Sequence, residues 1–264
     1  MNDQEAGRYW NENAQAWTEI ARAGFDIYRD FLNTPAFFDL LPEVDGLSGI
    51  DIGCGEGYNT RLLAQRGARV KAVDISERFV ERAKETQKDS PLDIEYLVAS
   101  ATELPFENEA FDFATSFMCL MDIPNLEKAL QEAYRVLRPG GFLQFSISHP
   151  CFTTPHRKNL RRFYGKTYAI EIGGYFEKLD GKIAEWIFGE APAELKNKFA
   201  KFKIPIFNRT LAEWFNAILD TGFIIERINE PYPDSETVNK QPSLQDTQIV
   251  AYFLHIRCRK PIAS

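Results

Sequence analysis

The fold is decided by one short stretch, Ile50-Asp51-Ile52-Gly53-Cys54-Gly55-Glu56-Gly57. The apolar residues before the first glycine are typical of a buried strand, and a helix is expected to begin near Tyr58. Glycines in such a turn let the backbone approach a ligand closely, and the free N–H groups at the start of the helix face that ligand. The stretch therefore predicts a strand, a loop and a helix that together hold a nucleotide-like molecule. A plain tight turn is the alternative.

The spacing of the glycines and two carboxylates narrow the kind of ligand. A dinucleotide-binding loop reads G-x-G-x-x-G, which would place its third glycine at position 58, where this chain has Tyr58. Asp74 ends the next predicted strand, where a carboxylate can accept hydrogen bonds from both hydroxyls of a ribose. Asp51 would repel a pyrophosphate but would attract a cationic amino group. These residues favour a nucleoside that carries an amino group over NAD.

Around this stretch, short apolar runs alternate with amphipathic stretches from residue 47 to residue 147. Such alternation is typical of a parallel sheet flanked by helices, so we expect an α/β fold of the Rossmann-like, doubly wound class. The apolar and amphipathic stretches are 49–52, 61–64, 70–73, 79–84, 94–98, 111–117, 126–137 and 142–147.

The chain is interpreted as a single domain in four parts. Residues 1–42 carry apolar side chains at helical spacing and are expected to form a helical N-terminal arm or lid. Residues 43–148 are the cofactor-binding core. Residues 149–208, rich in Lys, Arg, Gly and aromatic side chains without a clean period, are interpreted as an insertion after the fifth strand that caps the sheet. Residues 209–264 form the C-terminal part of the core sheet.

Regular structure is predicted to return in this last part. A helix at 210–220 is stopped at Gly222, and strands are expected around 223–228 and 248–257. Because a loop separates these two strands, they are interpreted as an antiparallel hairpin at the edge of the sheet.

Four ordered motifs resemble those of the class I methyltransferases, specifically the small-molecule subgroup described as type 11. The similarity covers roughly residues 47–148 and implies a mostly parallel seven-stranded sheet with an antiparallel C-terminal strand. It also implies S-adenosylmethionine as cofactor and S-adenosylhomocysteine as product. The motifs are D-x-G-x-G-x-G at 51–57, Asp74, Leu104-Pro105-Phe106 and Arg135-Val136-Leu137-Arg138-Pro139-Gly140-Gly141. The last is interpreted as a structural turn into the fifth strand.

The resemblance implies a cofactor site at the matching positions. In many relatives an Asp precedes Ala101 and accepts a hydrogen bond from the adenine amino group, whereas this chain has Ser100, whose hydroxyl can accept one bond. The contact with the adenine is therefore expected to be weaker. The implied residues are Asp51 for the amino group, Gly53, Cys54, Gly55 and Gly57 for the methionine part, Asp74 for the ribose, Ile75, Ser100, Ala101 and Thr102 around the adenine, and Ser116 and Phe117 on the methionine side.

Further candidates come with open alternatives. Tyr9, Trp10 and Trp17 could cover a sulfonium by cation–π attraction, or could be core residues of an amphipathic helix. His149, just beyond the fifth strand, is a candidate general base, or a hydrogen-bonded structural histidine beside a proline turn. The basic run that begins at His156-Arg157-Lys158 could recognise an acidic acceptor, although a solvated charged face is favoured.

Composition excludes several classes of function. The 264 residues have a formal net charge of −7, which disfavours binding to nucleic acid phosphates. The four cysteines are far apart without a C-x-x-C pair, so no metal site and no disulfide framework are expected. The polar start of the chain and the lack of a long apolar run indicate a cytoplasmic protein that does not associate with membranes. The oligomeric state is not indicated.

Three candidate functions are compatible with the sequence. The first is methyl transfer from S-adenosylmethionine to an unidentified small-molecule acceptor by in-line displacement. The second is a non-catalytic protein that binds S-adenosylmethionine or S-adenosylhomocysteine. A nicotinamide oxidoreductase is third, because it would need the other glycine spacing.

Overall fold

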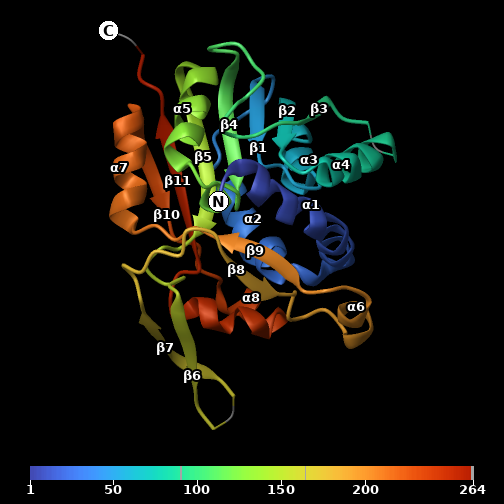
Figure 1. Cartoon of the computed structure of the whole chain (residues 1–264), viewed down its shortest axis with the longest axis vertical. Helices are drawn as coiled ribbons and strands as arrows, with labels where there is room; N and C mark the ends of the chain where they lie inside the picture. The colour runs from blue at the N-terminus through green and yellow to red at the C-terminus, as the bar shows by residue number, and fades with distance from the viewer. Residues whose placement is uncertain (90, 164, 263–264) are drawn as a thin grey trace.

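A central sheet of seven strands organises the computed structural model, which describes residues 1–89, 91–163 and 165–262 (Figure 1). The strands of this sheet are β1 (Ser48–Ile52), β2 (Arg69–Asp74), β3 (Ile94–Val98), β4 (Phe111–Phe117), β5 (Leu137–Ser148), β10 (Ile224–Asn229) and β11 (Phe253–Arg259). They lie in the order β10-β11-β5-β4-β1-β2-β3. Only β11 runs against its neighbours, β5 and β10, while the other pairs of this sheet are parallel. The predicted Rossmann-like class with an antiparallel C-terminal strand is confirmed.

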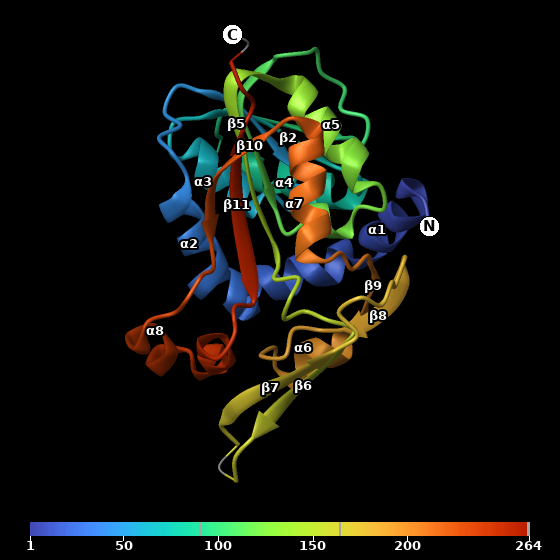
Figure 2. The ribbon, with the colours of Figure 1, turned by 90° about the vertical axis from the view of Figure 1, so that its left-hand side faces the viewer.

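Helices cover both faces of the sheet. On one face lie α2 (Thr34–Leu40), α3 (Tyr58–Ala64) and α4 (Glu77–Asp89), whose Phe37, Leu63 and Val80 belong to one buried cluster. On the other face lie α5 (Leu126–Val136) and α7 (Leu211–Thr221), which bury Leu130 and Ile218 in a second cluster. Figure 2 shows α2 and α3 on one side of the sheet and α5 and α7 on the other. With both faces covered, a ligand has access to the sheet at the carboxyl ends of its parallel strands.

The N-terminal arm is helical, as predicted. It contains α1 (Asp3–Ile20), π-helical turns at Ala21–Phe25 and Arg29–Asn33, and α2. α1 begins at a capping box in which Asn2 Oδ1 accepts from the Glu5 N–H and Glu5 accepts from the Asn2 N–H, both at 2.9 Å. The helix lies between the carboxyl edge of the sheet and strand β9 (Phe202–Ile206) (Figures 1 and 2).

The insertion after β5 consists of two hairpins. The first pairs β6 (His156–Arg161) with β7 (Thr167–Gly173), and the second pairs β8 (Lys182–Trp186) with β9, with α6 (Ala193–Lys198) between the strands of the second. The predicted lack of a clean period has a physical cause, because the half-buried and exposed positions of β7 and β8 do not alternate regularly and neither strand has a fully covered face. The first hairpin projects away from the rest of the molecule (Figures 1 and 2).

In the C-terminal part, the helix was predicted correctly but the bounds of the last strand were not. Helix α7 begins at a capping box between Thr210 and Glu213 and ends at Gly222, which has φ 99°. The last strand was expected around 248–257, but it runs from Phe253 to Arg259, and Gln248 closes a 3₁₀ helix (Pro242–Gln248). This helix and α8 (Ser235–Lys240), rather than a simple loop, join β10 to β11. In the described part of the chain, no helix is long and apolar enough to cross a membrane.

His255 on β11 links the sheet to the arm. Its side chain is fully buried, and its Nε2 lies 2.6 Å from Asn33 Oδ1, which also accepts from the Ser146 hydroxyl at 2.9 Å. Burial lowers the pKa of His255 to about 3. The histidine is therefore neutral in the folded protein, whereas in the unfolded chain it takes up a proton near pH 6.5.

This difference predicts acid-dependent stability. Between about pH 6.5 and pH 3 the unfolded state binds a proton that the folded state excludes, so stability is lost as the pH falls. We expect the free energy of unfolding of the wild type to fall, relative to that of His255→Leu, by about 1.4 kcal/mol per pH unit below about pH 6. Urea denaturation of both proteins at pH 7, 6 and 5 measures this difference. Parallel pH profiles would show that His255 does not titrate in this way.

Candidate functional site

The glycine loop connects β1 to α3 and needs its glycines for two reasons. Gly53, Gly55 and Gly57 have φ of 75°, 54° and 81°, a region that side chains disfavour. A Cβ on Gly53 would lie 2.1 Å from Cys119 Sγ, and one on Gly57 would lie 2.5 Å from the Tyr96 hydroxyl. A Cβ on Gly55 would meet no atom within 4 Å. Protein atoms therefore leave no room for a side chain at Gly53 or Gly57, whereas the space beside Gly55 is open.

Asp51 lies at the junction of β1, β4 and α3. It is 2% exposed, and its two carboxylate oxygens accept hydrogen bonds from Thr60 at 2.6 Å and Thr115 at 2.9 Å. Burial raises the pKa of Asp51, while the two hydroxyl donors oppose that shift. The result is a buried acidic group directly beneath the glycine loop, oriented by hydroxyls from two different elements.

Asp74, at the end of β2, is joined to the same loop. Its Oδ2 accepts from the Gly55 N–H and its Oδ1 accepts from the Ser76 N–H, both at 2.8 Å. Burial raises the pKa of Asp74 to about 6, and the two N–H donors oppose the shift. Ser76 separately caps α4, since its hydroxyl accepts from the Phe79 N–H at 3.2 Å. The structure therefore brings together Asp51, Asp74 and the open middle of the glycine loop.

The segment after β3 lies beside Asp74. The Ala99 N–H donates to the Asp74 carbonyl at 3.0 Å, so residues 99–102 continue the edge that Asp74 begins. Ser100 accepts from the Thr102 N–H at 3.2 Å and donates to Asp3 Oδ2 of α1 at 3.1 Å. The Thr102 hydroxyl also donates to Asp3 Oδ2. Of the expected adenine residues, Ser100 and Thr102 are thus contacted by a carboxylate from the arm.

The end of β4 has two kinds of side chain. Ser116 and Phe117 hold the strand in place: the Ser116 hydroxyl donates to the Ile52 carbonyl at 2.8 Å, and the Phe117 ring packs edge-on against Phe37 at 5.3 Å. Beyond them, Cys119 faces the glycine loop near Cys54, and burial raises the pKa of both thiols. Both thiols are therefore protonated at neutral pH.

The aromatic residues of α1 lie in a cluster with the insertion. The rings of Trp10 and Trp17 are 5.7 Å apart, and Trp17 also contacts Phe188 at 4.9 Å and Phe202 at 5.0 Å. Tyr9 lies beside Arg8 at 5.6 Å. For Trp10 and Trp17 this arrangement matches the packing alternative, and a contact of Tyr9 or Trp10 with a cofactor stays a prediction.

His149 lies directly after β5 and is 3% exposed. Its Nε2 is 2.8 Å from Glu230 Oε1, and its Nδ1 accepts from the Cys151 N–H at 3.2 Å. Both ring nitrogens therefore have partners within the protein, as in a hydrogen-bonded structural histidine. A role as general base stays a prediction.

Contacts that sequence reasoning missed hold the arm against the site. Asn11 Oδ1 accepts from the Ser76 hydroxyl at 3.1 Å and from the Arg78 N–H at 3.0 Å. Arg22 pairs with Glu56 of the glycine loop at 2.8 Å. The helical pattern of the arm predicted a helix, but periodicity does not reveal which polar side chains face a distant strand.

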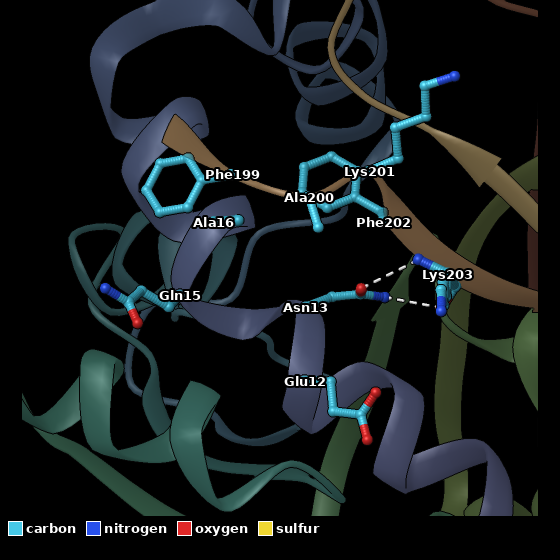
Figure 3. Close-up of a pocket in the computed structure, with 9 residues that line it drawn as sticks. All are labelled: Glu12, Asn13, Gln15, Ala16, Phe199, Ala200, Lys201, Phe202 and Lys203. Carbon is cyan, nitrogen blue, oxygen red and sulfur yellow. Dashed lines mark hydrogen bonds between the residues drawn. The ribbon is translucent and has the colours of Figure 1, made fainter. Parts of the chain in front are cut away.

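A shallow groove of about 260 Å³ marks where α1 meets the insertion (Figure 3). Residues of α1 and residues 199–203 line it. Asn13 crosses it, since its amide donates to the Lys203 carbonyl at 2.9 Å and accepts from the Lys203 N–H at 3.1 Å (Figure 3). The groove contains none of the expected cofactor residues, so it is a joint between arm and insertion rather than part of the candidate site.

The core of the chain is similar in sequence to known methyltransferases. A family described as "Methyltransferase domain" matches residues 50–145. A malonyl-[acyl-carrier protein] O-methyltransferase from Salmonella typhimurium is 35% identical over 42% of this chain and 43% of its own length. A demethylmenaquinone methyltransferase from Lactococcus lactis is 34% identical over 51% of this chain and 58% of its own length. The chain therefore spans about half the length of these curated relatives.

A solved structure extends the similarity beyond the core. An S-adenosylmethionine-dependent methyltransferase from Mesorhizobium loti superposes with a TM-score of 0.68 at 26% identity, over 85% of this chain and 96% of its own. An uncharacterized protein from Haemophilus influenzae is 30% identical over 76% of this chain and 77% of its own length. The likeness thus includes sequence on both sides of the matched family segment.

Proposed function

The chain belongs to the S-adenosylmethionine-dependent methyltransferase family, and from this premise we propose that it transfers a methyl group from S-adenosylmethionine to a small-molecule acceptor. The observation that carries the proposal is the joining of Asp74 to Gly55 beside the open middle of the glycine loop, with Asp51 beneath it. An amino-acid-bearing nucleoside has the groups that these residues can hold.

The methionine part fits the residues around β1. A carboxylate in a poorly solvated position attracts a ligand ammonium more strongly than one in water, and Asp51 has this position. The hydroxyls of Thr60 and Thr115 hold both of its oxygens without neutralising it. Open space at Gly55 admits ligand atoms next to the backbone.

The ribose part fits Asp74. Each carboxylate oxygen has about two acceptor positions, and one on each is taken by a backbone N–H. A free position therefore remains on each oxygen, enough for the two hydroxyls of one ribose. The first of these N–H donors is Gly55, so Asp74 would hold the ribose and the loop in a single arrangement.

The chemistry itself asks little of the protein. The bound cofactor would supply a methyl group that its sulfonium already activates. The protein then has to hold the acceptor in line at about 3 Å and to exclude water. We assign the exclusion of water to the arm and the insertion, which are joined to each other through Asn13 and to the glycine loop through Arg22 and Glu56. The acceptor would bind at the carboxyl edge of β4 and β5, beneath these two segments.

The names of the relatives indicate the class of acceptor. The curated relatives include enzymes of malonyl-[acyl-carrier protein], demethylmenaquinone and ubiquinone biosynthesis. All three are named methyltransferases, but their names give different molecules. For this chain we therefore propose a small organic acceptor without choosing between oxygen, nitrogen and carbon as the methylated atom.

Turnover separates this function from binding without catalysis. The purified protein is incubated with S-adenosylmethionine labelled in its methyl group and a panel of hydroxylated aromatics, acyl thioesters and amines. We expect at least one acceptor to become labelled while S-adenosylhomocysteine forms in equal amount. Tight cofactor binding without transfer to any compound across a broad panel would favour the non-catalytic alternative.

A further inference from the structure

Asp3 of α1 reaches the candidate site from outside the core. It is half-buried, and its Oδ2 accepts hydrogen bonds from the hydroxyls of Ser100 and Thr102, almost a hundred residues further along the chain. Its Oδ1 has no hydrogen-bond partner among the residues that the structure describes. An acidic residue in the first turn of a helix is ordinarily explained by the helix dipole, but that explanation does not require two hydroxyl partners from another element.

The sheet determines how far the partners of Asp3, Ser100 and Thr102, lie from Asp74. β2 and β3 are parallel neighbours with Asp74 opposite Val98, and the Ala99 N–H donates to the Asp74 carbonyl. Neighbouring strands are about 4.8 Å apart, so a base attached to a ribose at Asp74 is long enough to reach the segment that follows β3. A nucleoside whose ribose lies at Asp74 therefore directs its base either toward residues 99–102 or back over β1, where Asp51 and the glycine loop take the amino acid part.

At this edge Ser100 Oγ is surrounded by three protein groups: the Asp3 carboxylate, the Thr102 N–H and the Thr102 hydroxyl, whose oxygen lies 2.9 Å away. The Ser100 hydroxyl donates its proton to Asp3 and accepts from the Thr102 N–H. The strongest acceptor left at the edge is the Asp3 carboxylate, because an ionised carboxylate accepts more strongly than a neutral hydroxyl. The two hydroxyls that donate to its Oδ2 fix its orientation and leave Oδ1 for a ligand.

We propose that Asp3 is a specificity-determining residue that accepts a hydrogen bond from the exocyclic amino group of the cofactor's adenine. This inference rests on the proposed function. It makes the arm part of the binding site, so that closure of α1 and recognition of the base occur together. It also supplies a carboxylate at an edge where the residue before Ala101 is Ser100.

The test compares two ligands that differ at the edge of the base. S-inosyl-L-homocysteine carries a carbonyl in place of the amino group of S-adenosylhomocysteine. The wild type is expected to bind the adenine form more tightly by calorimetry, and Asp3→Ala is expected to reduce this preference by about 10- to 100-fold, the value of one charge-assisted hydrogen bond. Asp3→Asn, which keeps the size of the side chain and can donate to a carbonyl, is also expected to reduce it, and it decides the matter if Asp3→Ala melts near the assay temperature.

Asn11→Ala is the matched control, because it removes the contacts of α1 with Ser76 and Arg78 at the start of α4 and leaves Asp3 in place. It is expected to lower the affinity for both ligands by the same factor, so that the preference for the adenine form is unchanged. An unchanged preference in both Asp3 variants would overturn this inference alone. If the wild type bound neither ligand, the proposed function and this inference would fail together.

Discussion

Asp74→Ala is expected to weaken the binding of S-adenosylhomocysteine about 100-fold or more while the protein stays folded. The variant removes the acceptor for two ribose hydroxyls, and each charge-assisted hydrogen bond is worth about 1.5–3 kcal/mol. It also frees the Gly55 N–H, which loses the partner that holds the loop. Calorimetric titration measures the affinity, and circular dichroism with a thermal melt checks the fold. Unchanged affinity in a folded variant would remove Asp74 from the site.

Asp74→Asn is the conservative control for this result. The amide keeps the size of the side chain and one acceptor oxygen but loses the negative charge. We therefore expect an affinity between that of the wild type and that of Asp74→Ala. The pH profile gives a second reading. Because burial raises the pKa of Asp74 to about 6, the affinity of the wild type should fall as the pH drops below about 6, when the carboxylate takes up a proton.

Asp51→Asn is expected to weaken the binding of S-adenosylhomocysteine about 100-fold, because it removes a contact with the amino acid part of the ligand rather than with the ribose. The substitution keeps the shape of a 2% exposed side chain but removes the charge that would attract the ligand ammonium. The side-chain oxygen of Asn can still accept from Thr115, so the fold should be retained. Calorimetry on the folded variant gives the change in affinity, and a loss of less than twofold would contradict the assignment.

A truncated ligand distinguishes the two carboxylates. 5′-Methylthioadenosine has the ribose and the adenine but lacks the amino acid part. Its affinity should be unaffected by Asp51→Asn and strongly reduced by Asp74→Ala. If Asp51→Asn weakened both ligands equally, Asp51 would be acting on the architecture of the loop rather than on the ammonium.

The sequence alone predicted the parts of the molecule whose signals are local. The glycine loop, Asp74 and the end of α7 at Gly222 are each readable from a few neighbouring residues, because turn geometry and helix termination depend on local backbone conformation. The alternation of strands and helices then restricts the sheet to few arrangements.

The rest depends on contacts between segments far apart in the chain. The bonds from Ser100 and Thr102 to Asp3 and the packing of Trp17 on Phe188 join residues that no periodic pattern relates. The boundary of β11 was missed for a similar reason, since Tyr252, just before Phe253, packs in a cluster with Ile27 and Leu32 of the arm. Tertiary packing, rather than local preference, decides such positions.

A calorimetric titration of the wild-type protein with S-adenosylmethionine, S-adenosylhomocysteine and NAD under one set of conditions tests the cofactor assignment. We expect both sulfur nucleosides to bind and NAD not to bind, because the glycine spacing and Asp51 favour an ammonium over a pyrophosphate. Binding of NAD alone, or of none of the three, would contradict the proposed function and leave the fold as the only conclusion that stands.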